Sequence, residues 1–184
     1  MKKTLLIAIL AIATVSFFSC KKITLDDPNG GGVGDKVEIE TCPTTTVTLV
    51  AGQSIDAGTV AVTNDANFIY VTYTTANGYL LTQTHLFVGN CALLPVNGAG
   101  NPMPGQFPYA TNHNNVTTFT YQVPISALAG GSCGCIAAHA VVVKLNAAGS
   151  VIDQQTGWGN GVRINPNGGN WGMKFDYCSC SLNP

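Results

Sequence analysis

Residues 67–74, with the sequence Asn-Phe-Ile-Tyr-Val-Thr-Tyr-Thr, alternate in character from one position to the next. Successive side chains of an extended strand point to opposite faces, so Ile69, Val71 and Tyr73 share one face and the alternate residues 68–74 share the other. β-branched and aromatic side chains of this kind favour strands. The stretch therefore predicts a β-strand with one face in a hydrophobic core.

Other segments repeat this period of two, and turn residues separate them. The further strands that we expect cover residues 46–50, 59–62, 79–88, 117–123 and 136–145. Asn77-Gly78 predicts a tight hairpin between its flanking strands, because both residues tolerate a positive φ. No window of helical length has a 3.6-residue period, although residues 124–128 could form one helical turn.

This pattern predicts a single all-β domain, an antiparallel β-sandwich of the immunoglobulin-like or jelly-roll-like kind. One long connection interrupts it. Residues 89–116 contain many prolines and glycines, so we expect an irregular loop there. Loops of this length are often functional.

The first 19 residues have the features of a signal peptide. Lys2 and Lys3 are followed by an apolar run that ends at Phe18, and the small residue Ser19 precedes Cys20. The run is too short to span a bilayer comfortably. We therefore expect residues 1–19 to be removed, leaving Cys20 as the first residue of the mature chain.

The junction Phe17-Phe18-Ser19-Cys20-Lys21-Lys22 resembles the lipobox of Bacteroidota lipoproteins. The resemblance implies that Cys20 is diacylated, which would hold the protein on a membrane, since two acyl chains anchor stably. We expect that membrane to be the outer membrane of the cell envelope, with the domain in the periplasm or on the cell surface. Residues 20–41 include Pro28 and Gly30–Gly32 and predict a flexible tether. The β-sandwich domain then covers residues 42–184.

Six cysteines remain in that domain. An even number in an exported chain predicts three disulfides. Within each Cys-x-Cys pair the two side chains share a face, so they should bridge other segments rather than each other. We expect these pairs to attach the C-terminal segment to the strand that begins near Gly134, or to Cys42. Zinc bound by these thiolates is the alternative, although structural zinc usually uses a wider spacing. The six residues are Cys42, Cys91, Cys133, Cys135, Cys178 and Cys180.

Charged side chains are scarce, at 9% of the chain against roughly 25% in an ordinary domain. From Cys42 onward only Lys144, Arg163 and Lys174 are basic, and only four residues, all Asp, are acidic. A chain with so few basic groups has no patch that could bind nucleic acid. No local spacing brings two carboxylates together for glycoside hydrolysis.

Seven short motifs occur along the domain, at residues 61–65, 70–73, 84–89, 104–109, 136–142, 156–159 and 170–171. They include THLFVG, PGQFPY and IAAHAVV. Taken together and in this order, they resemble a family of secreted, mostly uncharacterised β-sandwich proteins of bacteria and some fungi. The likeness covers most of residues 45–177 and implies fold and export but no chemistry.

The three histidines of the chain lie in or beside these motifs. His85 and His139 fall in predicted strands, and His113 falls near the end of the long loop. Three imidazoles could bind one Zn²⁺ or Cu²⁺ with water as the fourth ligand. The alternative is that each is satisfied by ordinary hydrogen bonds, His139 as a core residue beside Val141 and Val143.

Tyr109, Trp158 and Trp171 are candidate ligand-binding residues. Flat aromatic rings beside neutral amides suit a sugar face, although tryptophans are usually buried. We identify no catalytic residues. Gly130–Gly134 matches the G-x-S-x-G pattern, but a nucleophile elbow needs a strand before it and a helix after it, and here a loop precedes and a strand follows.

The sequence thus favours a lipid-anchored binding or surface module of the cell envelope without catalysis. Its partners would be the membrane, through the lipid, and a glycan or an envelope protein. A metal-binding protein or metalloenzyme built on the three histidines is one alternative, and a structural role in a surface assembly is another.

Overall fold

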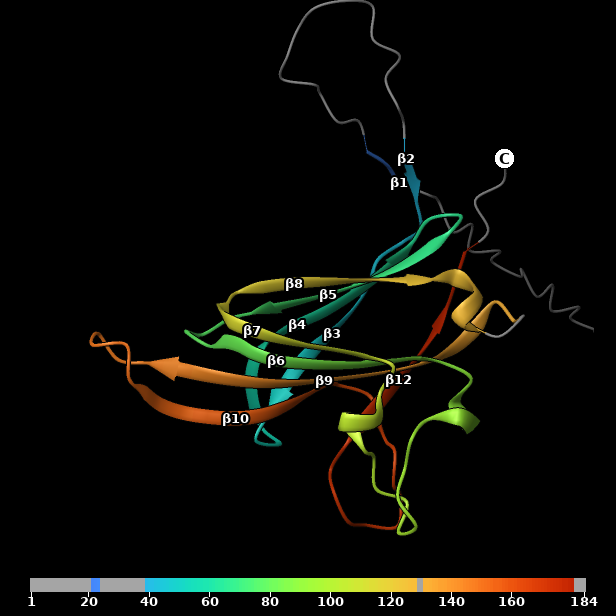
Figure 1. Ribbon diagram of the computed structural model, residues 1–184. Helices are drawn as coiled ribbons and strands as arrows, with labels where there is room; N and C mark the ends of the chain where they lie inside the picture. Colours follow the sequence, from blue (N-terminus) through green and yellow to red (C-terminus); the bar gives the residue numbers. More distant parts are fainter. Residues whose placement is uncertain (1–20, 24–38, 129–130, 181–184) are drawn as a thin grey trace, which may run out of the picture.

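The computed structural model describes residues 21–23, 39–128 and 131–180, and β-strand is the main secondary structure there (Figure 1). Three short 3₁₀ helices complete it: η1 (Cys91–Leu93), η2 (Pro104–Gln106) and η3 (Ile125–Leu128). The strands of the domain are β3 (Thr45–Ala51), β4 (Ile55–Asn64), β5 (Phe68–Thr75), β6 (Leu80–Gly89), β7 (Tyr109–Val116), β8 (Thr118–Pro124), β9 (Cys133–Leu145), β10 (Val151–Gly159), β11 (Val162–Arg163) and β12 (Met173–Cys178).

Hydrogen bonding joins these strands into one antiparallel sheet in the order β7-β6-β9-β10-β3-β4-β5-β8. The sheet curls so that β8, β5, β4 and β3 face β7, β6, β9 and β10 (Figure 1). β12 pairs with the beginning of β9, beside β10, and β11 pairs with β12. The result is a nearly closed, barrel-like sandwich, which confirms the expected all-β antiparallel class.

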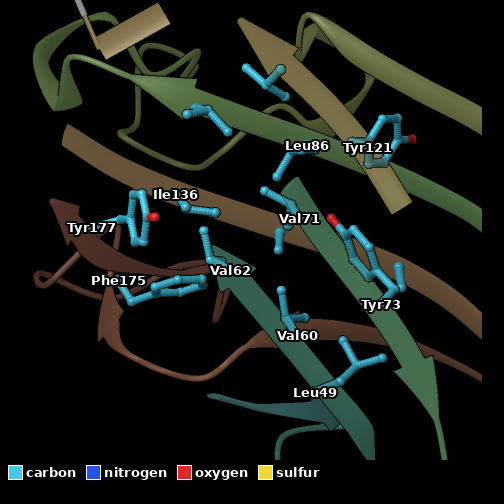
Figure 2. Close-up of a cluster of buried hydrophobic side chains, with 14 of the residues drawn as sticks. Leu49, Val60, Val62, Val71, Tyr73, Leu86, Tyr121, Ile136, Phe175 and Tyr177 are labelled. Atoms are coloured by element: carbon cyan, nitrogen blue, oxygen red, sulfur yellow. The ribbon is translucent and has the colours of Figure 1, made fainter. Parts of the chain in front are cut away.

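The space between the two layers holds the main hydrophobic core (Figure 2). Val60, Val71 and Leu86 have no solvent exposure, and Tyr73 is buried with its hydroxyl donating to the carbonyl oxygen of His85 at 3.1 Å. Alternation along β6 and β9 sends Leu86 and Ile136 inward with the same period that the sequence displays. Apolar burial of this extent is the principal source of stability.

Three disulfides tie the domain together, as the sequence predicted. Cys42–Cys180 joins its two ends across 138 residues, Cys133–Cys178 joins β9 to β12, and Cys91–Cys135 joins η1 to β9. Neither Cys-x-Cys pair bridges itself. Because all six sulfur atoms are bonded to one another in pairs, none is left as a thiolate ligand, and the zinc alternative for these cysteines is wrong.

The turn at Asn77-Gly78 forms, but the hairpin does not. Both residues have positive φ, 54° and 80°, and the amide of Tyr79 donates to the carbonyl of Ala76 at 3.0 Å. The strands on either side are not paired with each other, since β5 pairs with β4 and β8 whereas β6 pairs with β7 and β9. The turn instead carries the chain from one layer to the other, where Tyr79 is buried.

The long irregular connection is shorter than expected. Its last part, Tyr109–Val116, is strand β7, which pairs with β6. Its remainder, residues 90–108, contains η1 and η2 and is called here the first outer loop. The predicted helical turn is confirmed as η3. Strands β10 and β12 lie in segments that the sequence did not mark as strands.

The expected signal peptide and the lipidated Cys20 lie outside the described residues. At the two ends of the expected tether, β1 (Lys21–Ile23) and β2 (Ile39–Thr41) form a two-stranded antiparallel sheet, and residues 24–38 lie outside the description. Within the part of the chain that is described, no helix has the length and apolar character needed to cross a membrane.

Candidate functional site

A second layer of buried residues covers the outer face of β6, β9 and β10. The first outer loop and residues 160–172, called here the second outer loop, lie against this face (Figure 1). Phe87 and Ala137, one position beyond Leu86 and Ile136, point outward into this layer. The residues that form this outer cluster are Phe87, Leu94, Phe107, Cys135, Ala137 and Trp158.

The two loops are held to each other by asparagine side chains. Asn101 Oδ1 accepts hydrogen bonds from Asn165 Nδ2 at 3.2 Å and from the amide of Asn170 at 2.9 Å. Asn165 Nδ2 also donates to the carbonyl of Ala99 at 2.9 Å. Gly169 has a φ of +82°, and a Cβ there would stand 2.2 Å from Asn101 Oδ1, so the close approach of the loops requires glycine.

His85 and His139 come together on this outer face. They are directly opposite each other in the β6–β9 register, and their Nδ1 atoms lie 3.2 Å apart. One ring must donate and the other accept, which requires complementary neutral tautomers. Burial lowers the pKa of His85, and burial together with the neighbouring His85 lowers the pKa of His139 to about 3. Both imidazoles are therefore uncharged at neutral pH.

His113 does not join them. Its Nε2 lies 2.8 Å from the hydroxyl of Thr84, which in turn lies 2.8 Å from the hydroxyl of Tyr121. Thr84 is fully buried and points inward, so this contact lies on the other face of β6 from His85. Among the described residues no group of three or more His, Cys, Asp or Glu could hold a metal ion. The structure thus gathers two of the three candidate metal ligands.

Trp158 lies beside the histidine pair. It faces His139 in the β9–β10 register, with ring centroids 4.8 Å apart, and its indole also meets the ring of Phe107 edge-on at 6.2 Å. Only 5% of Trp158 is exposed. The main role of Trp158 is therefore in packing. Its indole forms one wall of a cavity and is not an open surface for stacking.

Trp171 is half-buried and borders two cavities. The first, of about 310 Å³, has His139, Trp158 and Trp171 as its rings. Its other lining residues are Pro102, Pro104, Thr156, Asn170 and Gly172. The second, of about 400 Å³, is lined by Val50, Gln53, Ser54, Asn160, Arg163, Trp171 and Met173. Trp171 is common to both, so the two cavities adjoin along one indole.

Tyr109, the third aromatic candidate, is not one of the residues that line these cavities. Its ring packs against Tyr121 at 6.1 Å, among the residues that border the main core. The candidate binding residues therefore divide, with Trp158 and Trp171 together and Tyr109 apart. Sequence reasoning missed Gln53, Asn160 and Arg163. The only signal for Arg163 was that it is one of three basic residues in the domain.

Comparisons with protein-family models, with curated proteins and with solved structures find no match to this chain. The function of the protein must therefore be inferred from the chemistry and geometry of the site. Chemically, the site offers one accessible indole, neutral hydroxyl and amide groups, an uncharged imidazole and a single guanidinium. Within the described ranges of the chain, no residue with a carboxylate lines either cavity.

Proposed function

We propose that this protein is a lipid-anchored module of the cell envelope that binds a glycan across Trp171. One observation carries the proposal: a half-buried indole separates two adjoining cavities whose polar lining is mostly neutral hydroxyls and amides. Sugars present C–H groups to aromatic faces and hydroxyls to such neutral partners. Cavities of about 310 and 400 Å³ are within the size range of small-ligand sites.

The backbone around Trp171 supports a preformed site. Asn101 fixes the amide of Asn170 at 2.9 Å, and the amide of Ile164 donates to the carbonyl of Gly172 at 2.9 Å, so hydrogen bonds hold the chain on both sides of the indole. Cys91–Cys135 fastens the first outer loop to β9. A site that is already ordered loses less entropy on binding.

The cell-envelope part of the proposal depends on the leader and on the disulfides. Three disulfides are typical of an oxidising compartment outside the cytoplasm. A lipid on Cys20 would place the domain at a membrane surface, with residues 21–41 between the lipid and the domain. A binding module held in this way meets polymeric glycans at high local concentration, which compensates for a weak single site.

A glycan array probed with the purified full-length protein tests the proposal. We expect binding by the wild type, a loss of roughly tenfold or more for Trp171→Ala, and partial retention for Trp171→Phe. Phe68→Ala is the matched control, because Phe68 is a half-buried aromatic residue on β5 in the opposite layer. Absence of binding to every glycan, or equal binding by Trp171→Ala, would rule out this site.

A further inference from the structure

Arg163 gives the second cavity a charge that the rest of the site lacks. It lies in β11, opposite Met173 of β12, and lines the cavity with Asn160, Trp171 and the residues named above. It is the only charged residue in either outer loop. From Gln154 to Phe175 the chain contains no acidic residue at all. A guanidinium in such surroundings attracts anions.

Three of the four acidic side chains of the folded domain accept hydrogen bonds from other groups. Asp56 accepts from the amide of Gly58 at 3.0 Å, and Asp65 accepts from the hydroxyl of Tyr70 at 2.6 Å. Asp153 accepts from the hydroxyl of Tyr79 at 2.6 Å and from Gln155 Nε2 at 2.7 Å. The fourth, Asp176, is an exposed residue of β12. Among the described residues, none of the four carboxylates lines the Arg163 cavity, so a ligand carboxylate there would not compete with one of the protein's own.

We infer that the ligand is an acidic glycan, with the carboxylate of a uronic acid residue bound by Arg163 and the neighbouring sugar ring against Trp171. The planar fork of a guanidinium matches a carboxylate with two parallel hydrogen bonds. Gln53, Ser54 and Asn160 supply neutral partners for the hydroxyls of the same sugar. This inference rests on the proposed function, because it assigns the glycan class to the same site.

The solvent exposure of Arg163 limits how strongly an acidic glycan is preferred over a neutral one. Arg163 is a surface residue, so water and salt screen its interaction with a carboxylate. We expect an acidic oligosaccharide to bind roughly three- to tenfold more tightly than its neutral counterpart at low salt. The preference should shrink as ionic strength rises, whereas the contribution of Trp171 should not.

The test compares oligouronides with the same oligosaccharides after methyl esterification, which removes the charge and keeps the sugar. Affinities are measured by calorimetry for the full-length protein, for Arg163→Gln and for Trp171→Ala. We expect Arg163→Gln to lose the preference and keep its affinity for the ester, and Trp171→Ala to lose both ligands. Lys174→Gln is the matched control, since Lys174 is the nearest cation in sequence and does not line the cavity.

The possible results separate a failure of this inference from a failure of the proposed function. Equal binding of acid and ester by the wild type, or an intact preference in Arg163→Gln, overturns the inference. Tighter binding of a sulfated oligosaccharide than of the uronide overturns the assignment to a carboxylate. If neither uronide nor ester binds while the array identifies a neutral glycan, the acidic class is wrong and the proposed function stands. Failure of every glycan on the array removes both.

Discussion

The two faces of strands β6 and β9 are buried in different ways. Their inner face carries Leu86 and Ile136 and packs against the opposite layer of strands (Figure 2). Their outer face carries His85 and His139 and is covered by two loops. Antiparallel sheets commonly leave one face to solvent, so strands covered on both sides are unusual in this class. We infer from this difference that the inner face maintains the fold, whereas the outer face forms the proposed ligand-binding site.

The largest expected effect comes from the inner face. Leu86→Ala removes a side chain with no solvent exposure and should lower the free energy of unfolding by about 2–5 kcal/mol, because it leaves a cavity in a packed core. Urea denaturation of the two proteins measures the difference. Ile152→Ala, at a position that is 64% exposed, should change stability by no more than about 0.5 kcal/mol. Equal losses for the two variants would contradict this account of the core.

The next largest effect concerns the packing of the two outer loops, which is distinct from the packing of the main core. A Cβ at Gly172 would stand 2.3 Å from Pro102 Cγ and 3.2 Å from Trp158 Cζ2, so Gly172→Ala must push the loops apart. We expect a loss of about 1–3 kcal/mol together with loss of glycan binding. Gly98→Ala, in the first outer loop with no atom within 4 Å of the new Cβ, should leave both unchanged. Normal glycan binding by Gly172→Ala would show that the site does not need this packing.

As the pH falls, the free energy of unfolding should decrease because of His139 before the carboxylates become protonated. The pKa of His139 is about 3 in the folded protein and about 6.5 in the unfolded chain. Below pH 6.5 the unfolded chain therefore binds a proton that the folded protein does not bind. Its contribution to stability is complete above pH 6.5 and decreases as the pH falls toward 3. The slope approaches about 1.4 kcal/mol per pH unit for one proton.

Urea denaturation between pH 7 and 4.5 measures this slope, and the range stays above the ordinary titration of Asp. His139→Gln should flatten the dependence. His113→Gln should flatten it less, because His113 is only half-buried. A dependence that is unchanged in His139→Gln would mean that the histidine pair is not held neutral by the fold.

The smallest expected effect on stability is that of Arg163→Gln. Arg163 is exposed, so its removal should change the free energy of unfolding by no more than about 0.5 kcal/mol while it alters ligand preference. Thermal unfolding of the variant beside the wild type checks this. A large loss of stability would mean that Arg163 supports the second outer loop rather than a ligand.

Much of the inner face could be predicted from the sequence, because it follows a simple rule of alternation. Ile69, Val71 and Tyr73 are all fully buried on one face, as their spacing indicated. The rule that i and i+2 share a face also predicted that Cys133 and Cys135 bridge other segments. Strand β7 was missed because three of its four exposed positions are asparagines, a residue type typical of loops.

The outer face could not be predicted in this way, because it depends on which strands become neighbours. His85 and His139 are 54 residues apart and meet only because β6 pairs with β9 in one particular register. The sequence grouped His113 with them. In the structure His113 contacts Thr84, which points to the opposite face of β6 from His85. The place of Arg163 beside Trp171 likewise requires the fold of the second outer loop.

Hydrogen exchange of the full-length protein, with and without the oligosaccharide that binds it most tightly, tests the central claim most directly. We predict protection of amides in the second outer loop, residues 160–172, around Trp171, and no change in β5 and β8 of the opposite layer. Protection confined to β5 and β8, or none in either outer loop, would contradict the assignment of the binding site to the outer face of β6, β9 and β10.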